Sequence, residues 1–172
     1  GHPDALKFDW VDKFQSRVHV ILALGIGGEV PMLQAVAHRC PNSLLIYRAY
    51  SYGSLGESDH FHEYYAQHGA DPLPLIQAHE PCFSAFKDIN YRVAYQLWNE
   101  TGDDDNSWTH FVEFNTNYIR EMDKRGLSAA ILGTGPGRPS GTREQIRAKW
   151  EIARPLFEAI NQATHPHYLN MH

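Results

Sequence analysis

The residues best suited to chemistry lie at the end of a short apolar segment, YQLWNE (95–100). Its alternating residues predict a buried strand, which ends on the amide of Asn99 and the carboxylate of Glu100. Glutamate is rarely buried without a partner, so Glu100 either meets solvent or caps a following helix, or it is held there for chemistry. Partial burial beside Trp98 would raise the pKa of a carboxyl group and suit it to proton donation. Glu100 is therefore the candidate catalytic residue.

The elements that would position Glu100 alternate along the chain. Apolar and β-branched runs predict five strands, at residues 18–24, 43–53, 92–98, 128–135 and 167–172. Helical spacing of apolar residues predicts helices at 8–14, 31–40, 57–68, 74–88, 108–126 and 142–160. The last of these should break before Pro155, and Gly126 should end the one that precedes it.

This alternation of strands and helices predicts an α/β fold with parallel strands and right-handed crossovers. Two architectures fit, an open doubly wound sheet and a (β/α) barrel. A complete eight-unit barrel needs about 200 or more residues, and this chain has 172 residues and five predicted strands. We therefore expect parallel β/α units of an incomplete TIM-type barrel, with residues 1–172 as a single barrel-like domain or fragment.

In both architectures the functional face lies at the carboxyl ends of the strands. Polar, aromatic and acidic side chains are expected at that face. They include Arg48, Tyr50, Trp98, Asn99, Glu100, Asn170 and His172. Such a surface suits a neutral, polyhydroxylated ligand better than a phosphate.

Other kinds of site have weaker support. The glycine-rich segments GIGGEV (25–30) and GTGPGRPSG (133–141) match neither dinucleotide nor P-loop patterns, so they are interpreted as loops. His60, His62 and Glu63 lie close together, but they lack the H-E-x-x-H spacing of a zinc helix and fit a solvated surface. We therefore predict no metal and no cofactor.

Charge and hydropathy also bear on partners. The net charge is −5 and no basic cluster occurs, which excludes an electrostatic footprint for nucleic acid. No apolar run is long enough to span a membrane, and no signal peptide is visible, so the localisation stays open. Cys40 and Cys82 lack a C-x-x-C pattern; a single bridge between them is left open.

The W-N-E segment at a strand end resembles the retaining glycoside hydrolases with (β/α)8 barrels, the clan that contains cellulases, mannanases and β-xylosidases. In that clan an Asn-Glu pair ends the fourth barrel strand. The resemblance implies that Glu100 is the acid/base, that Asn99 contacts the sugar 2-hydroxyl, and that Trp98 is a platform or wall. RAY (48–50) looks like the end of the preceding strand and LNMH (169–172) looks like the sixth, which adds Arg48, Tyr50 and His172 as substrate contacts.

The resemblance also has departures. Thr101 stands where the clan commonly has proline, and the five strands match barrel strands two to six. The clan's nucleophilic glutamate ends strand seven, so the nucleophile is expected beyond the end of the chain. The resemblance implies a carbohydrate ligand, and exposed strand edges predict a homo-oligomer. The alternatives are a non-catalytic α/β domain that binds carbohydrate or a small polar ligand, and a folded domain without a ligand.

Overall fold

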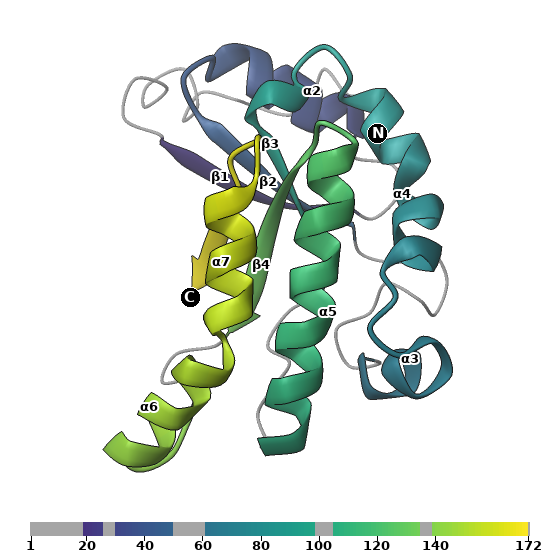
Figure 1. Cartoon of the computed structure of the whole chain (residues 1–172). Helices are drawn as coiled ribbons and strands as arrows, with labels where there is room; N and C mark the ends of the chain where they lie inside the picture. The colour runs from purple at the N-terminus through teal and green to yellow at the C-terminus, as the bar shows by residue number, and fades with distance from the viewer. Residues whose placement is uncertain (1–18, 26–29, 50–60, 99–104, 135–138, 172) are drawn as a thin grey trace.

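The computed structural model of the chain describes residues 19–25, 30–49, 61–98, 105–134 and 139–171 (Figure 1). Strands and helices alternate along these residues. In chain order they are β1 (Val20–Gly25), α2 (Val30–Arg39), β2 (Leu44–Ala49), α3 (Phe61–His68), α4 (Leu73–Ala85), the 3-10 turn η3 (Asn90–Arg92), β3 (Val93–Gln96), α5 (Asp105–Lys124), β4 (Ser128–Thr134), α6 (Arg143–Ile152), α7 (Arg154–Gln162) and β5 (Tyr168–Met171). The five predicted strands are confirmed. The helix predicted at 8–14 lies outside the described residues.

Two predicted helix ends are also confirmed. The helix expected at 142–160 divides into α6 and α7 at Ala153, just before Pro155. Helix α5 ends at Lys124, and Gly126, two residues later, has a φ of +70° and caps it. The Gly126 N–H donates to the Asp123 carbonyl, and the Leu127 N–H donates to the Met122 carbonyl, both at 3.0 Å. This pair of bonds is the Schellman pattern, in which glycine tolerates the left-handed conformation best.

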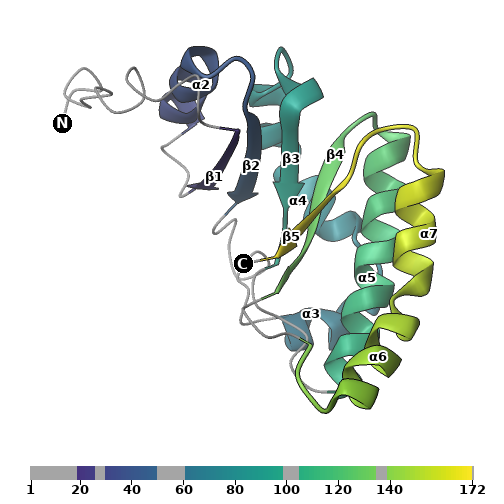
Figure 2. The same cartoon turned by 90° about the vertical axis from the view of Figure 1, so that its left-hand side faces the viewer.

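All five strands are parallel and lie in the order β1-β2-β3-β4-β5. A doubly wound sheet needs a reversal of strand order at a switch point. None occurs in this sheet, so the doubly wound alternative does not describe it. The sheet instead curls into a half-barrel, and Figure 2 shows its strands in sequential order.

The described helices cover the convex face of this curled sheet. The main core joins residues of α2, α3, α4, α5 and α7 to one face of the strands, including Tyr47, Val93, Tyr95 and Ile131. Successive crossovers of one hand, always to the next strand, place every helix on the same side. This arrangement gathers the carboxyl ends of all five strands along one edge (Figure 2).

The concave face of the sheet has its own small apolar cluster, to which none of the described helices contributes. Ile46, Ala94 and Ala130 are buried there, with Leu44 and Tyr168 packed against them. Residues on the β1 edge are open to solvent, with Val20 at 53% and Leu22 at 45% exposure.

Candidate functional site

A polar row lies on the concave face, one layer closer to the carboxyl ends of the strands than the small apolar cluster. We define it as Arg48 on β2, Gln96 on β3 and Asn170 on β5. Because side chains alternate along a strand, Arg48 shares the face of Ile46, and Gln96 shares the face of Ala94. Arg48 and Gln96 are also register partners in the sheet.

The amides of Gln96 and Asn170 connect two strands that are not neighbours. Asn170 Nδ2 donates to Gln96 Oε1 at 2.6 Å, although β4 runs between β3 and β5. Two strand spacings are about 9.6 Å in a flat sheet. The bond can form because the sheet curls there and because β4 carries the small residue Ala130 on this face. The hydrogen bond therefore joins β3 to β5 directly across the concave side of the sheet.

Gln96 is almost completely buried, with 1% of its surface exposed. Its Nε2 donates to the Trp98 carbonyl oxygen at 2.8 Å, in addition to the bond that it accepts from Asn170. A buried amide is costly unless its polar atoms are bonded. Both ends of the Gln96 amide meet this condition, so the residue is fixed in place.

Trp98 lies on the other side of this strand end, among aromatic residues of the helical layer. Trp98 is 3% exposed. The centroid of its ring lies 5.3 Å from that of Phe61, 5.6 Å from that of Tyr64 and 5.9 Å from that of Phe114. This burial fits a wall behind the strand end rather than an exposed platform. Contact between Trp98 and a substrate stays a prediction.

Of the residues predicted at the functional face, the structure places Arg48, Trp98 and Asn170. It brings Arg48 and the end of β3 to the same edge of the sheet. The other predicted site residues, Tyr50, Asn99, Glu100 and His172, lie outside the described residues. Gln96 was not among the predicted site residues. The available signal was a glutamine inside a strand that otherwise reads as buried.

Gln96 is buried and bonded within the polar row, whereas Arg48 and Asn170 are partly exposed and offer a guanidinium and an amide group. These groups match hydroxyl and carbonyl groups of a neutral ligand. Within the described ranges, no strand end carries a carboxylate. The same residues contain no group of three or more His, Cys, Asp or Glu side chains arranged for a metal ion. Cys40 and Cys82 are both buried and do not form a disulfide with each other.

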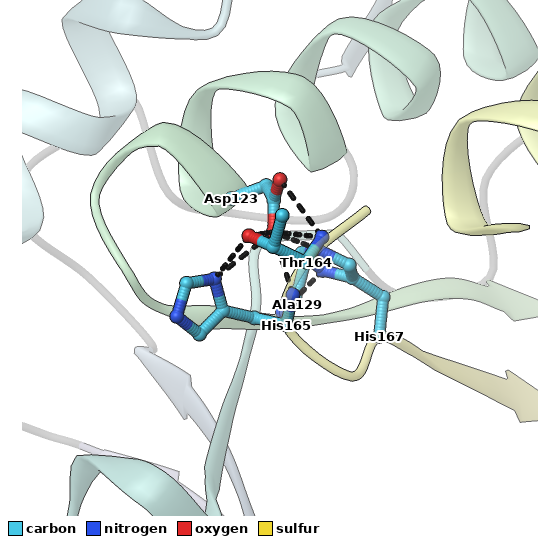
Figure 3. Close-up of polar contacts among 5 residues, drawn as sticks. All are labelled: Asp123, Ala129, Thr164, His165 and His167. Carbon is cyan, nitrogen blue, oxygen red and sulfur yellow. Dashed lines mark hydrogen bonds and ion pairs between the residues drawn. The ribbon is translucent and has the colours of Figure 1, made fainter. Parts of the chain in front are cut away.

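A second polar cluster lies at the opposite end of the sheet, where α5 and α7 lead into β4 and β5 (Figure 3). Asp123 Oδ1 accepts bonds from the N–H of His165 at 2.8 Å, the Oγ1 of Thr164 at 3.0 Å and the N–H of Thr164 at 2.9 Å. Burial raises the pKa of Asp123, but the backbone N–H groups and side chains of Thr164 and His165 outweigh it. They hold the pKa well below its usual range. This clamp, made of Asp123, Thr164 and His165, fastens the α7–β5 loop to α5.

His167 extends the clamp toward the sheet. The Ala129 N–H donates to His167 Nδ1 at 3.0 Å, so the proton of the neutral ring is on Nε2. Nε2 lies 3.8 Å from Asp123 Oδ1. Burial lowers the pKa of His167, and the nearby Asp123 charge only partly opposes this effect. The residue is therefore a neutral link between β4 and the start of β5, which is a structural role.

A surface groove in the described part of the chain is lined in part by Asp123 of the clamp. It has a volume of ≈ 680 Å³ and lies on the outer surface of α5, between residues 70–73 and 159–163. Its ionic groups include Lys124 and Glu121, which pair with each other at 2.5 Å. The groove is thus a surface depression on the helical layer that borders the clamp and includes no residue of the polar row.

Comparison with known proteins adds no assignment, because no family model, curated protein or solved structure matches the chain. The fold and the polar row therefore define its class: an α/β protein with a curled five-strand parallel sheet, helices on its convex face and an amide-rich row on its concave face. Among the described helices, none has the length and apolar character needed to cross a bilayer.

Proposed function

We propose that this chain is part of a TIM-type barrel glycoside hydrolase of the retaining class, with Glu100 as its general acid/base. The observation that supports this proposal best is the sequential parallel order of the strands, with the described helices on one face. In such an arrangement the carboxyl ends of the strands share one edge. The W-N-E segment then follows β3 at the edge where a barrel enzyme binds its substrate.

The proposed reaction has two steps. Glu100 protonates the departing glycosidic oxygen while a second carboxylate attacks the anomeric carbon, which breaks the C–O bond and forms a glycosyl-enzyme ester. Glu100 then takes a proton from water, whose oxygen attacks the same carbon and releases the second carboxylate. The two carboxyl groups must be about 5–5.5 Å apart. We propose that the second one is supplied by a strand that completes the barrel.

The remaining predicted residues would hold the sugar. Asn99 would contact the 2-hydroxyl, and Arg48, Tyr50 and His172 would line the same edge. The buried ring of Trp98 supports the role of an apolar wall, which would keep water away from the acid. An apolar wall favours the protonated form of a nearby carboxyl group.

A second candidate is a binding domain without catalysis. It is supported by the polar row, whose described residues offer amide and guanidinium groups but no carboxylate. Such a row can orient a carbohydrate or another small polar ligand without breaking a bond. The two candidates share the ligand edge and differ in whether Glu100 transfers a proton.

The variant Glu100→Gln separates the candidates, with Glu144→Gln on the exposed surface of α6 as its matched control. The assay is hydrolysis of aryl glycosides by a polypeptide that carries this chain and the strands that complete the barrel. Loss of a general acid should lower hydrolysis of poor leaving groups by about 10²–10⁴-fold. Dinitrophenyl glycosides should be affected less, because their leaving group needs no proton.

Binding measurements on the 172-residue chain complete the test. Unchanged hydrolysis in Glu100→Gln would contradict the enzymatic proposal. Calorimetric binding of an oligosaccharide without hydrolysis in any variant would support the binding domain. A glycan array without signal would favour a folded domain without a carbohydrate ligand.

A further inference from the structure

The end of β3 departs from the ordinary alternation of a strand. Val93 and Tyr95 face the helices, and Ala94 and Gln96 face the concave side. Continued alternation would place Leu97 with the helices and Trp98 on the concave side. Instead, both Leu97 and Trp98 belong to the core on the helical side. The chain therefore turns immediately after Gln96, and something must hold it in that turned conformation.

The hydrogen bond from Gln96 to the Trp98 carbonyl is the contact made at this turn. The orientation of the Gln96 amide follows from its partners. A carbonyl can only accept, so Gln96 must present its NH₂ group to Trp98 and its oxygen to Asn170. Asn170 must then present its own NH₂ group, as its 2.6 Å bond to Gln96 Oε1 requires. The three groups form a directional relay from β5 through β3 to the Trp98 carbonyl.

We propose that Gln96 is a positioning residue, because this relay holds the peptide plane through which the chain leaves β3 toward Asn99 and Glu100. A peptide group is planar and rigid, so a bond to the Trp98 oxygen fixes the orientation of the whole unit. Asn170 acts on this unit from β5 through its hydrogen bond to Gln96. The relay itself stands on described residues, and only its consequence for proton transfer rests on the proposed function of Glu100.

Two variants of Asn170 test the direction of the relay. Asn170→Leu removes the donor, which leaves Gln96 free to keep its bond to Trp98. Asn170→Asp replaces the donor by an acceptor, so Gln96 should turn its NH₂ group toward residue 170 and its oxygen toward the Trp98 carbonyl. Both variants lose the original bond to Gln96. Of the two, only Asn170→Asp should also break the hydrogen bond from Gln96 to the Trp98 carbonyl oxygen. Gln96→Met removes this hydrogen bond directly, because methionine has no amide group.

The Trp98 carbonyl can be observed alone. Trp98–Asn99 is the only Trp-Asn pair in the sequence, so ¹³C-carbonyl tryptophan with ¹⁵N-asparagine gives one correlated NMR signal for this peptide. We expect the carbonyl signal to move upfield in Asn170→Asp and Gln96→Met, by a similar amount. It should stay near its original position in Asn170→Leu. Asn161→Asp, an exposed change of the same chemistry on α7, should leave it unchanged.

A purely structural role predicts a different result. In that case Asn170→Asp and Asn170→Leu would lower the melting temperature without separating in the Trp98 signal, and the proposal would be overturned. If the Trp98 carbonyl signal of Asn170→Asp stays at its original position, the proposal is also overturned. This result is sufficient even if Gln96→Met fails to fold. If the signal moves as expected while no variant hydrolyses a glycoside, the relay stands and the proposed function of Glu100 fails.

Discussion

Replacement of Asp123 by alanine should lower the free energy of unfolding by about 2–3 kcal/mol, because a hydrogen bond to a charged group contributes about 1.5–3 kcal/mol and a neutral one about 1 kcal/mol. The carboxylate accepts bonds from the N–H, Oγ1 and Nδ1 groups of Thr164 and His165, at 2.8 to 3.1 Å. The side chain of Asp123 is 21% exposed. Water can therefore replace some of these bonds, which keeps the expected loss below their sum.

The contribution of Asp123 should also depend on pH. Its pKa is lowered in the folded protein, so the folded state binds a proton less readily than the unfolded chain, whose aspartate pKa is about 3.9. The stabilisation is therefore fully present above that pKa and is lost as the pH falls through the lower, folded value. The difference between the native chain and Asp123→Ala should be constant near neutral pH and should shrink in acid.

The assay is urea unfolding followed by circular dichroism, at pH 7 and at about pH 3.5, on opposite sides of the unfolded pKa. Asp88→Ala, an exposed aspartate between α4 and η3, is the control. The expected loss corresponds to a melting temperature lower by about 4–12 °C in a chain of this size. Equal unfolding free energies for the native chain and Asp123→Ala at pH 7, or a difference that does not shrink in acid, would refute the role of the clamp.

Three further outcomes are expected. Trp98→Ala should destabilise the fold by about 3–5 kcal/mol in thermal melts, because it empties a buried aromatic site; a loss below 1 kcal/mol, the size of a typical surface change, would contradict its place in the core. The lowered pKa of His167 means that acid favours protonation of the unfolded chain, so stability should fall as the pH drops below about 6.5, and His167→Asn should flatten this dependence. The exposed β1 edge should promote self-association that Leu22→Lys weakens, and a monomeric native chain in light scattering at micromolar concentration would count against it.

Local patterns in the sequence were sufficient to predict the strands and helices, but not the order of the strands in the sheet. The apolar runs located the five strands, and Pro155 and Gly126 located helix ends, because these features depend on neighbouring residues. The choice between a doubly wound sheet and a curled sequential sheet depends on which strands pair across the chain. Local periodicity carries no information on that pairing.

The contacts of the candidate site could not be predicted from the sequence for a related reason. Residues 96 and 170 are separated by 74 positions, so their hydrogen bond follows only from the curl of the sheet. Trp98 was expected at the strand end, as a platform or a wall. Its ring is buried because the alternation stops at Gln96, a break that the apolar pattern YQLW does not reveal.

The two ends of the sheet use their polar groups differently, and this difference separates effects on stability from effects on a ligand. At the amino end of the strands, charged groups bind backbone: Asp123 holds residues 164 and 165, and Arg92 donates to the carbonyl oxygens of Ala37 at 2.6 Å and Cys40 at 2.8 Å. At the carboxyl end, the amides of Gln96 and Asn170 hold one strand exit. Variants of Asp123 and Arg92 should therefore lower stability without changing ligand contacts. Variants of the amide pair should alter the ligand edge as well as lower stability, since loss of one partner leaves a buried amide group without its hydrogen bond.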